Sequence, residues 1–411
     1  MKRTIAALCA TTALALPTAS WSADLEVTHW WTSGGEAAAV SEFAKAFNEQ
    51  TEHNWVDGAI AGSGGTARPI IISRILGGDP MHATQLNHGR QAEELVEAGL
   101  MLDLTDIAEA EGWADVVNPV RLLDACTLDG KVYCVPVNIH SPQWLWLSHD
   151  AFAKAGVDVP ADWFEFVEAA PALRDAGLVP LAMGQQSWQT SLAFGALMVA
   201  VGGTDLYIDV LTNKNADAAA SEDMTKVWEA YAAARLLSEG SNVNDWNQAT
   251  NLVITGQAGG QIHGDWAQGE FQVAEQVAGE DYTCLPGLGV NEIIATGGDA
   301  FYFPKQDDPE IEAAQKELAS LMISQEVQVA FNLKKGSLPI RGDIDLSAAN
   351  DCMQKGLAIL AAGNVLPDGV NSFSADTAGQ IDDLTVEFWN DTSITVEDAQ
   401  ARYVDIIASA D

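Results

Sequence analysis

The chain has 411 residues, of which 48% are hydrophobic and 19% are charged, a composition typical of a folded globular protein rather than a disordered one. Its 58 acidic and 20 basic residues give a net charge of −38. This charge repels phosphate backbones and anionic lipid headgroups, so neither nucleic acid nor a membrane surface is an expected partner. A chain of this length usually divides into two domains, because a single hydrophobic core rarely grows so large.

The first residues, 1–22, have the features of a secretory signal peptide. Two basic residues follow the initial methionine, an apolar run covers 5–16, and small residues follow, with cleavage compatible after Ala19 or Ser22. Cys9 lies in this leader and is expected to be lost with it. Beyond the leader, no continuous apolar stretch reaches the roughly 18 residues of a membrane span. We therefore expect an exported, soluble protein, most simply one of a bacterial periplasm.

Four cysteines remain in the mature chain: Cys126, Cys134, Cys284 and Cys352. An even number of cysteines in an exported chain favours disulfides over a metal site. Asp129-Gly130 is a hairpin-turn signal, so a bridge across this hairpin, Cys126–Cys134, is predicted first. The pair Cys284–Cys352 then follows by elimination, while unpaired cysteines or a bridge between domains remain alternatives.

The start of the mature chain alternates between two patterns. Apolar and polar residues alternate as in strands at 25–30, 54–61 and 81–87, and apolar residues recur at helical spacing at 36–50, 66–78 and 89–101. This order predicts an α/β domain with a largely parallel sheet. Ligands of such domains bind beyond the carboxyl ends of the strands.

A β-rich segment, 132–150, then interrupts the alternation, and we interpret it as a crossing between domains. Helices are predicted at 151–155, 163–176, 191–201, 224–237, 247–255 and 309–333, a strand running into a helix at 258–271, and one strand at 292–305. A turn rich in Gly and Pro follows the last of these helices, at 334–343.

Tryptophan is unusually frequent, with 13 copies against 6 tyrosines. Those beside Gly, Asp, Asn, Gln or Glu are candidates for a ligand site: Trp30, Trp31, Trp188, Trp246 and Trp266. Those inside strand or helix patterns are expected in the core: Trp55, Trp113, Trp163 and Trp228. Sugar rings present apolar C–H faces and hydroxyl rims, so aromatic platforms with polar neighbours are typical of a sugar site.

No signature of catalysis or of a cofactor stands out. The motifs of serine hydrolases, zinc peptidases and phosphate-binding loops are missing, and no two histidines have metal-ligand spacing on one helix. A carboxylate pair such as Glu36 with Asp299 could in principle hydrolyse a glycoside. We expect no enzyme activity, no metal and no cofactor, and keep an exported glycoside hydrolase as an alternative.

Five motifs in one order resemble a known family: WWTSGGE, LAMGQQSWQT, IHGDWAQGEF, GGDAFYFPK and KKGSLPIR. They look like the periplasmic sugar-binding proteins of ABC import systems, most of all the glucose/mannose-binding group. The resemblance implies two α/β lobes that close on a sugar by a hinge motion. It implies chain crossings near 135–138, 295–299 and 338–341, an N-terminal lobe of 23–136 plus 297–339, and a C-terminal lobe of 137–296 plus 340–411.

The resemblance also implies the ligand contacts. Carried over by position, they are Trp30, Trp31, Glu36, Gln85, Asn87, Trp188, Gln189, Asp265, Trp266, Asp299 and Lys335. Tryptophans would stack on the sugar, Glu36 and Asp299 would accept hydrogen bonds from hydroxyls, and Lys335 would donate. Because neighbours on a strand face opposite ways, one of Trp30 and Trp31 is expected to be a sugar platform and the other a cleft wall or a core residue.

Two positions depart from the family pattern. Asn87 stands where the family usually has His or Lys, and the stretch from Ser372, SFSADTAG, lacks the usual His. Both changes remove donors from the expected glucose site. The resemblance therefore predicts a monosaccharide receptor that delivers its ligand to the membrane subunits of an ABC permease, with a pentose, another hexose, a sugar alcohol or a glycoside as alternatives to glucose. A monomer is expected.

The same architecture could also hold a ligand that is not a sugar. An amino acid would need an arginine clamp for its carboxylate, and Arg68, Arg90 and Arg341 are candidates. A polyamine would need several carboxylates around aromatic rings, which the acidic composition allows.

Overall fold

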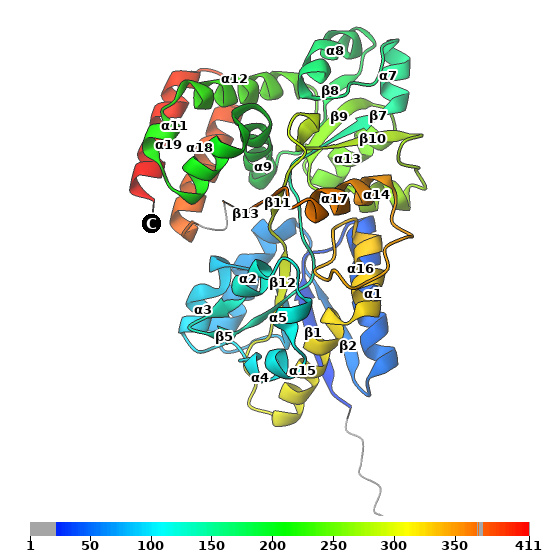
Figure 1. Ribbon diagram of the computed structural model, residues 1–411, viewed down its shortest axis with the longest axis vertical. Coiled ribbons are helices and arrows are strands. Elements are labelled where there is room, and N and C mark those ends of the chain that lie inside the picture. The colour runs from blue at the N-terminus through cyan, green and yellow to red at the C-terminus, as the bar shows by residue number, and fades with distance from the viewer. Residues whose placement is uncertain (1–21, 368, 370–372, 411) are drawn as a thin grey trace, which may run out of the picture.

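The computed structural model of the protein describes residues 22–367, 369 and 373–410. The predicted signal peptide, apart from Ser22, lies outside these residues, as does Ser372. The described chain forms two α/β lobes, each built around its own sheet, with connecting strands between them (Figure 1). This confirms the two-lobed α/β fold predicted from the sequence.

The first lobe contains a five-stranded sheet. Its order is β2 (Asn54–Ala59), β1 (Asp24–His29), β3 (Ala83–Asn87), β12 (Asp299–Tyr302) and β6 (Cys134–Pro136). β1 is parallel to β2 and β3, whereas β12 is antiparallel to β3 and β6. Asp299 pairs with Asn87, so the start of β12 meets the carboxyl end of β3. This is the edge at which ligand sites of parallel sheets form.

Helices cover both faces of this sheet. They are α1 (Gly34–Gln50), α2 (Ser63–Leu76), α3 (Glu93–Glu97), α4 (Thr105–Ala110), α5 (Trp113–Val116), α6 (Arg121–Asp124), α15 (Pro309–Ile323) and α16 (Gln325–Lys335). α1 buries Ala39, Phe43 and Phe47 along one stripe, as the helical spacing predicts. The ring of Phe43 stacks on Phe331 of α16 with centroids 4.2 Å apart, which fixes α16 beside α1.

The predicted helix at 89–101 is wrong in extent. The segment forms a short turn, η1 (Arg90–Ala92), followed by the brief α3. Gly89 and Gly99 have φ values of +92° and +72°. An α-helix requires negative φ, so these two glycines bound the helical part on either side.

The second lobe is built on a four-stranded sheet. Its order is β10 (Tyr282–Pro286), β7 (Trp144–Ser148), β9 (Ala258–His263) and β8 (Val179–Leu181). Its helices are α7 (His149–Ala155), α8 (Trp163–Asp175), α9 (Ser187–Leu197), α10 (Gly203–Tyr207), α11 (Ala216–Ala219), α12 (Glu222–Leu237), α13 (Trp246–Ile254), α14 (Ala267–Val273), α18 (Ala375–Asn390) and α19 (Val396–Ser409). The C-terminal helices thus return to this lobe and pack near α12 (Figure 1).

One run of this lobe, Ser187–Thr212, is long and apolar enough to cross a membrane by length and composition alone. It comprises α9, the π-turn η2 (Met198–Gly202), α10 and the π-turn η3 (Ile208–Thr212). Gly203 interrupts it with a φ of +82°. α9 packs against α12 and α18, and half of the apolar window is buried inside the lobe, so we interpret the run as core.

Connecting strands join the lobes. β11 (Ile294–Thr296) pairs in parallel with β13 (Val365–Pro367), and isolated bridges link Ile139 with Leu338 and His140 with Gly297. The single strand predicted at 292–305 is therefore wrong, because Gly297 and Gly298 separate β11, in the connection, from β12, in the first sheet. The exact boundaries of the lobes stay a prediction.

Both predicted disulfides are present. Cys126–Cys134 spans the hairpin of β4 (Thr127–Leu128) and β5 (Lys131–Val132), with Cα atoms 5.1 Å apart. Asp129 and Gly130 form its turn with φ values of +51° and +77°. Cys284–Cys352 joins β10 to α17 (Asp351–Ala361), with Cα atoms 5.9 Å apart.

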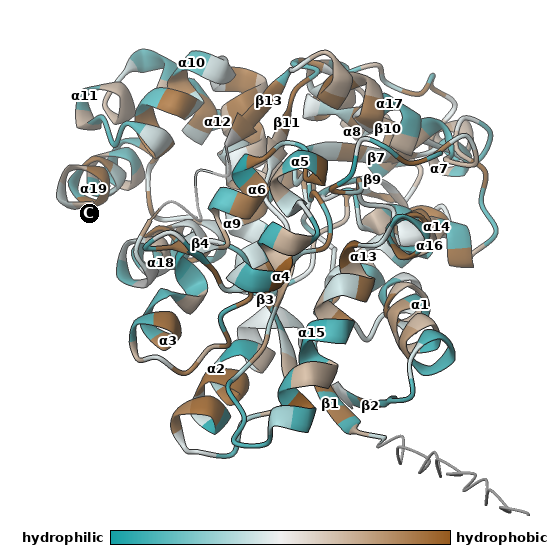
Figure 2. Ribbon diagram, turned by 60° about the horizontal axis from the view of Figure 1, so that its bottom comes forward, coloured by the Kyte–Doolittle hydropathy of each residue, from teal (hydrophilic) through white to brown (hydrophobic). Residues whose placement is uncertain are grey.

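The tryptophans assigned to the core behave as expected in three positions. Trp113, Trp163 and Trp228 are buried, whereas Trp55 is half-buried against the first core. Hydrophobic and hydrophilic stretches alternate along most helices (Figure 2). Each lobe therefore has a hydrophobic core of its own. The space between the lobes is not needed for either core and is available for a ligand site.

Candidate functional site

A cavity of about 150 Å³ lies between the lobes, at the carboxyl edge of the first sheet. Its lining is unusually rich in aromatic and charged groups: Trp30, Trp31, Glu36, Ser63, Gly64, Arg68, Asn87, His140, Trp188, Trp246, Trp266, Asp299 and Lys335. We call this cavity the cleft. Both lobes contribute to it, because α9, α13 and the segment before α14 carry Trp188, Trp246 and Trp266.

The tryptophan pair follows the end of β1 at His29. Trp31 is buried, and its ring contacts Phe301 and Phe331 with centroids 5.7 and 5.2 Å away. Trp30 is half-buried, and its backbone N–H donates to Gln85 Oε1 at 3.0 Å. Both rings line the cleft, with Trp31 also anchored in the core of the first lobe.

A buried ion pair closes one side of the cleft. Lys335 Nζ, at the last turn of α16, donates to Glu36 Oε1, in the first turn of α1, at 2.8 Å. Burial raises the pKa of Glu36, and Lys335 opposes this rise. The ammonium also lies 5.5 Å from the ring centre of Trp31 and 5.9 Å from that of Trp266. Lys335 is therefore buried, with its ammonium held between a carboxylate and two indole rings.

A histidine between two carboxylates forms the floor. His140 Nε2 bonds to Asp299 Oδ2 at 2.5 Å, and His140 Nδ1 bonds to Asp265 Oδ1 at 2.9 Å. Burial opposes protonation of the ring, but Asp299 and Asp265 outweigh it and raise the pKa of His140 to about 9. Burial likewise opposes ionisation of Asp299, yet the His140 charge and hydrogen bond hold the pKa of this carboxyl below its usual range. At neutral pH the unit is a charged His140 held by carboxylates.

Aromatic rings line the side formed by the second lobe. Trp266 Nε1 donates to His263 Nε2 at 2.7 Å, and Trp246 stacks on His263 with centroids 5.2 Å apart. Trp188 lies 6.3 Å from Trp266, centre to centre, with the planes tilted by 46°. Burial lowers the pKa of His263 to about 3, so this ring stays neutral and fixes the two indoles by packing and hydrogen bonding.

The structure divides the predicted contacts into two groups. Trp30, Trp31, Glu36, Asn87, Trp188, Trp266, Asp299 and Lys335 line the cleft. The other three lie behind its wall. Gln85 Nε2 donates to Asp299 Oδ1 at 2.8 Å, Asp265 bonds to His140, and Gln189 Oε1 accepts from the Gly184 N–H at 3.0 Å. Gln85 and Asp265 thus position lining residues of the cleft, whereas Gln189 bonds to the backbone of the second lobe.

Sequence reasoning left several lining residues out of the contact set: Ser63, Gly64, Arg68, His140 and Trp246. Trp246 had a signal, because it is one of the tryptophans with polar neighbours. Arg68 was a candidate clamp without an assigned place, whereas Arg341 pairs with Asp343 at 2.7 Å. His140 had no local signal, because its partners are 125 and 159 residues away in the chain.

The two lobes touch on both sides of the cleft. Gly35, at the start of α1, donates its N–H to Glu270 Oε1 of α14 at 2.8 Å, and a Cβ at Gly35 would lie 2.5 Å from the Gly269 backbone. Gln186 Nε2 approaches Ser63 Oγ at 3.4 Å. The Gly35 amide at the start of α1 thus donates to a carboxylate, which suits the positive end of a helix.

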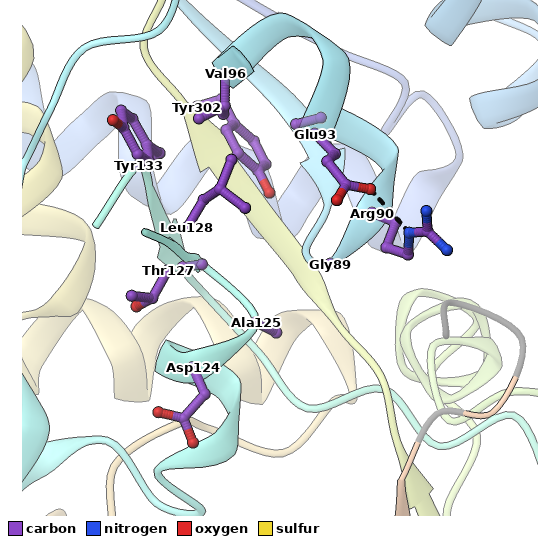
Figure 3. Close-up of a pocket in the computed structure, with 12 residues that line it drawn as sticks. Gly89, Arg90, Glu93, Val96, Asp124, Ala125, Thr127, Leu128, Tyr133 and Tyr302 are labelled. Atoms are coloured by element: carbon purple, nitrogen blue, oxygen red, sulfur yellow. Dashed lines mark hydrogen bonds and ion pairs between the residues drawn. The ribbon is translucent and has the colours of Figure 1, made fainter. Parts of the chain in front are cut away.

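Within the described residues there is no group of three or more His, Cys, Asp or Glu side chains arranged to hold a metal ion. A different hollow, of about 190 Å³, lies in the first lobe beside the β4–β5 hairpin (Figure 3). Tyr302, Leu128 and Val96 line it, and Arg90 Nε bonds to Glu93 at its rim. None of the predicted ligand contacts is among its described lining residues.

Two lobes around an aromatic and charged cleft define the class of two-lobed solute receptors. The pattern of the family described as "Bacterial extracellular solute-binding protein" matches residues 31–329. A relative from Brucella melitensis, named "Probable sugar-binding periplasmic protein", is 34% identical over 343 residues, which cover 83% of this chain and 80% of the relative. The chain belongs to the bacterial extracellular solute-binding protein family, and it is a periplasmic protein.

Solved structures share the fold. The bacterial solute receptor AcbH, reported to prefer b-D-galactopyranose exclusively, has a TM-score of 0.75 and 20% identity, covering 93% of this chain and 98% of that chain. A chitin oligosaccharide binding protein has a TM-score of 0.77 and 17% identity, and the match covers 94% of this chain and 98% of that chain. These likenesses confirm the two-lobed fold.

Proposed function

We propose that the protein is the sugar-binding component of an ABC importer and holds a sugar ring in the cleft. The main support for this proposal is the composition of the cleft wall. Indoles of both lobes surround charged groups that are buried and oriented by other side chains. Indole faces match the C–H face of a pyranose, and fixed carboxylate and ammonium groups match its hydroxyls. The names of the relative in Brucella melitensis and of AcbH support this ligand class.

Each polar group in the cleft has a proposed role. Glu36 and Asp299 accept hydrogen bonds from sugar hydroxyls, while Lys335 and Arg68 donate. Asn87 donates one N–H of its side-chain amide to the Gly298 carbonyl at 3.2 Å, so the other amide N–H and the side-chain oxygen are left for a ligand. A neutral amide replaces the cationic donor of the glucose-type pattern at this position. We therefore propose a hexose-like ring as the unit bound here, with glucose no longer favoured over other hexoses, delivered to a permease by a monomeric receptor.

We also propose that the cleft binds without turnover. Glycoside hydrolysis needs one carboxyl group that releases a proton and one that attacks or activates water. Asp299 accepts hydrogen bonds from His140, Asn138 and Gln85, and Glu36 is paired with Lys335. Both carboxylates are thus held in place as fixed acceptors.

A thermal-shift panel tests the proposal. The purified protein is heated alone and with millimolar glucose, galactose, mannose, xylose, arginine or spermidine, and hits are titrated by calorimetry. A sugar at 1,000 times its Kd should stabilise the fold by about 4 kcal/mol. Stabilisation by arginine or spermidine alone would favour a receptor for amino acids or polyamines, in which Arg68 or the cleft carboxylates take the lead. A panel without any sugar response contradicts the proposal.

A matched pair of variants locates the site. Trp30 and Trp55 are both half-buried in the first lobe, but only Trp30 lines the cleft. Trp30→Ala should lower the sugar affinity by about tenfold or more, and Trp55→Ala should leave it within about twofold of the wild type. Equal effects of the two variants would place the sugar elsewhere.

A further inference from the structure

A second cavity, of about 430 Å³, adjoins the cleft. Arg68, Asn87 and Trp188 line both cavities, so the two meet at these side chains. We call the larger cavity the side chamber. Pockets for small molecules typically measure about 300–1,000 Å³. The cleft alone, at about 150 Å³, falls below this range, whereas the cleft and the side chamber together lie within it.

The walls of the side chamber have the mixed character of a sugar site. Leu192 and Leu211 of the second lobe and Phe373 provide apolar surface, and Gln143 and Asp382 provide polar groups. Sugar units need this combination, because their ring faces are apolar and their rims carry hydroxyls. The chamber is therefore chemically suited to a further unit of the same ligand.

Two helix glycines keep the side chamber open. Gly195 lies within α9 and Gly379 within α18, and both line the chamber. A Cβ added at either position meets no atom within 4 Å, so close packing does not require glycine there. Glycine inside a helix costs about 0.5–1 kcal/mol relative to alanine. Space in the chamber is the feature that both glycines share.

The boundary between cleft and chamber contains buried donors that find no acceptor among the described residues. Arg68 lies 5.6 Å from the ring centre of Trp30, and within the described residues it forms no hydrogen bond or ion pair. Its Nε and the Nε1 of Trp188 are buried N–H groups without an acceptor among those residues. Buried donors without partners are costly, so a ligand acceptor at this boundary would satisfy them.

The charges at the boundary favour an uncharged ligand. The carboxylates of Asp299, which lines the cleft, and of Asp382, which lines the chamber, both attract the Arg68 guanidinium. Neither carboxylate forms an ion pair with it. An anionic group at Arg68 would approach both carboxylates in a protein of net charge −38. Hydroxyl groups can instead accept from Arg68 and donate to Asp382.

We infer that the ligand is a neutral glycoside of at least two units, with one ring in the cleft, a second sugar-sized unit in the side chamber, and their linkage beside Arg68 and Trp188. The inference rests on the proposed function and extends it from a single ring to a disaccharide class. It also assigns the glycines of α9 and α18 as determinants of ligand length.

The test compares affinities for single and paired rings by calorimetry. Glucose and galactose are titrated beside cellobiose, maltose, lactose and trehalose into the wild type, Gly195→Leu and the control Gly195→Ala. In the wild type, at least one disaccharide should bind about tenfold more tightly than its component monosaccharides. Gly195→Leu should remove most of this preference for the disaccharide, because the leucine side chain fills the chamber. Gly195→Ala should retain the preference. If Gly195→Leu does not fold, Gly379→Leu applies the same test from the facing helix.

The possible results separate the two proposals. The inference is overturned if the wild type binds disaccharides and monosaccharides with equal affinity. It is also overturned if a folded Gly195→Leu variant keeps the full preference for the disaccharide. In both cases, binding of a monosaccharide still upholds the proposed function. Binding of no sugar at millimolar concentration overturns the proposed function and the inference with it. A high ratio that Gly195→Leu removes supports both.

Discussion

The charge of His140 should make the stability of the protein depend on pH. Its pKa is raised from 6.5 to about 9 by Asp299 and Asp265, against the effect of burial. A group whose pKa is higher in the folded than in the unfolded protein contributes its full stabilisation at pH values below the unfolded pKa. This stabilisation is lost as the pH rises through the folded pKa. Stability should therefore fall between pH 6.5 and about 9. At about 1.36 kcal/mol of free energy for each unit of pKa difference, the total loss is on the order of a few kcal/mol.

The assay is urea unfolding at several pH values from 6 to 9.5, followed by fluorescence and circular dichroism with the disulfides intact. His140→Gln removes the titrating charge and leaves Asp265 and Asp299 without the imidazolium between them, so it should destabilise the protein most at pH 6 and least at pH 9.5. His149→Gln controls for the loss of a ring, because the partners of His149 among the described residues are a carbonyl and a hydroxyl group rather than carboxylates. A constant difference between wild type and His140→Gln across this pH range refutes the reasoning.

Three further predictions concern single side chains. Trp188→Ala should weaken sugar binding about tenfold to a hundredfold in calorimetry, and unchanged binding would remove Trp188 from the site. Glu270→Gln should weaken binding about two- to fivefold, because it removes the negative charge at the start of α1 that links the lobes, whereas the exposed Glu275→Gln should have no effect. Lys335→Met should cost about 3–5 kcal/mol of unfolding free energy, as it leaves Glu36 unpaired. The double variant with Glu36→Gln should regain most of this loss in urea unfolding, and a failure to do so would show that the ion pair is not the cause.

Local patterns in the sequence were sufficient for the framework of the fold. Helical spacing placed α1, because Phe43 and Phe47 recur on its buried face, and the turn signal at 129–130 placed the hairpin and its disulfide. The helix expected at 89–101 failed because conformation there is set by positive φ at Gly89 and Gly99, which spacing of apolar residues does not report.

The sequence predicted cleft residues correctly only where a family motif falls on a segment that borders the cleft. The motif WWTSGGE contributed three residues that line the cleft, since it spans the end of β1 and the start of α1. Gln85 and Asp265 lie one layer deeper, and a strand pattern cannot separate a side chain that touches a ligand from one that orients such a side chain. His140 was missed because its meaning comes from carboxylates that distant segments bring to it.

The origin of the cleft residues explains why the two lobes must act together. Glu36, Lys335 and Asp299 come from α1, α16 and β12 of the first lobe, and Trp188 and Trp266 come from the second. A sugar on the indoles alone would leave its hydroxyls in water, and one beside the charges alone would leave one ring face unpacked. The arrangement in which Glu270 meets the start of α1 offers both kinds of contact at once. We therefore expect a bound ligand to favour this arrangement of the lobes, because a ligand stabilises the arrangement with which it makes more contacts.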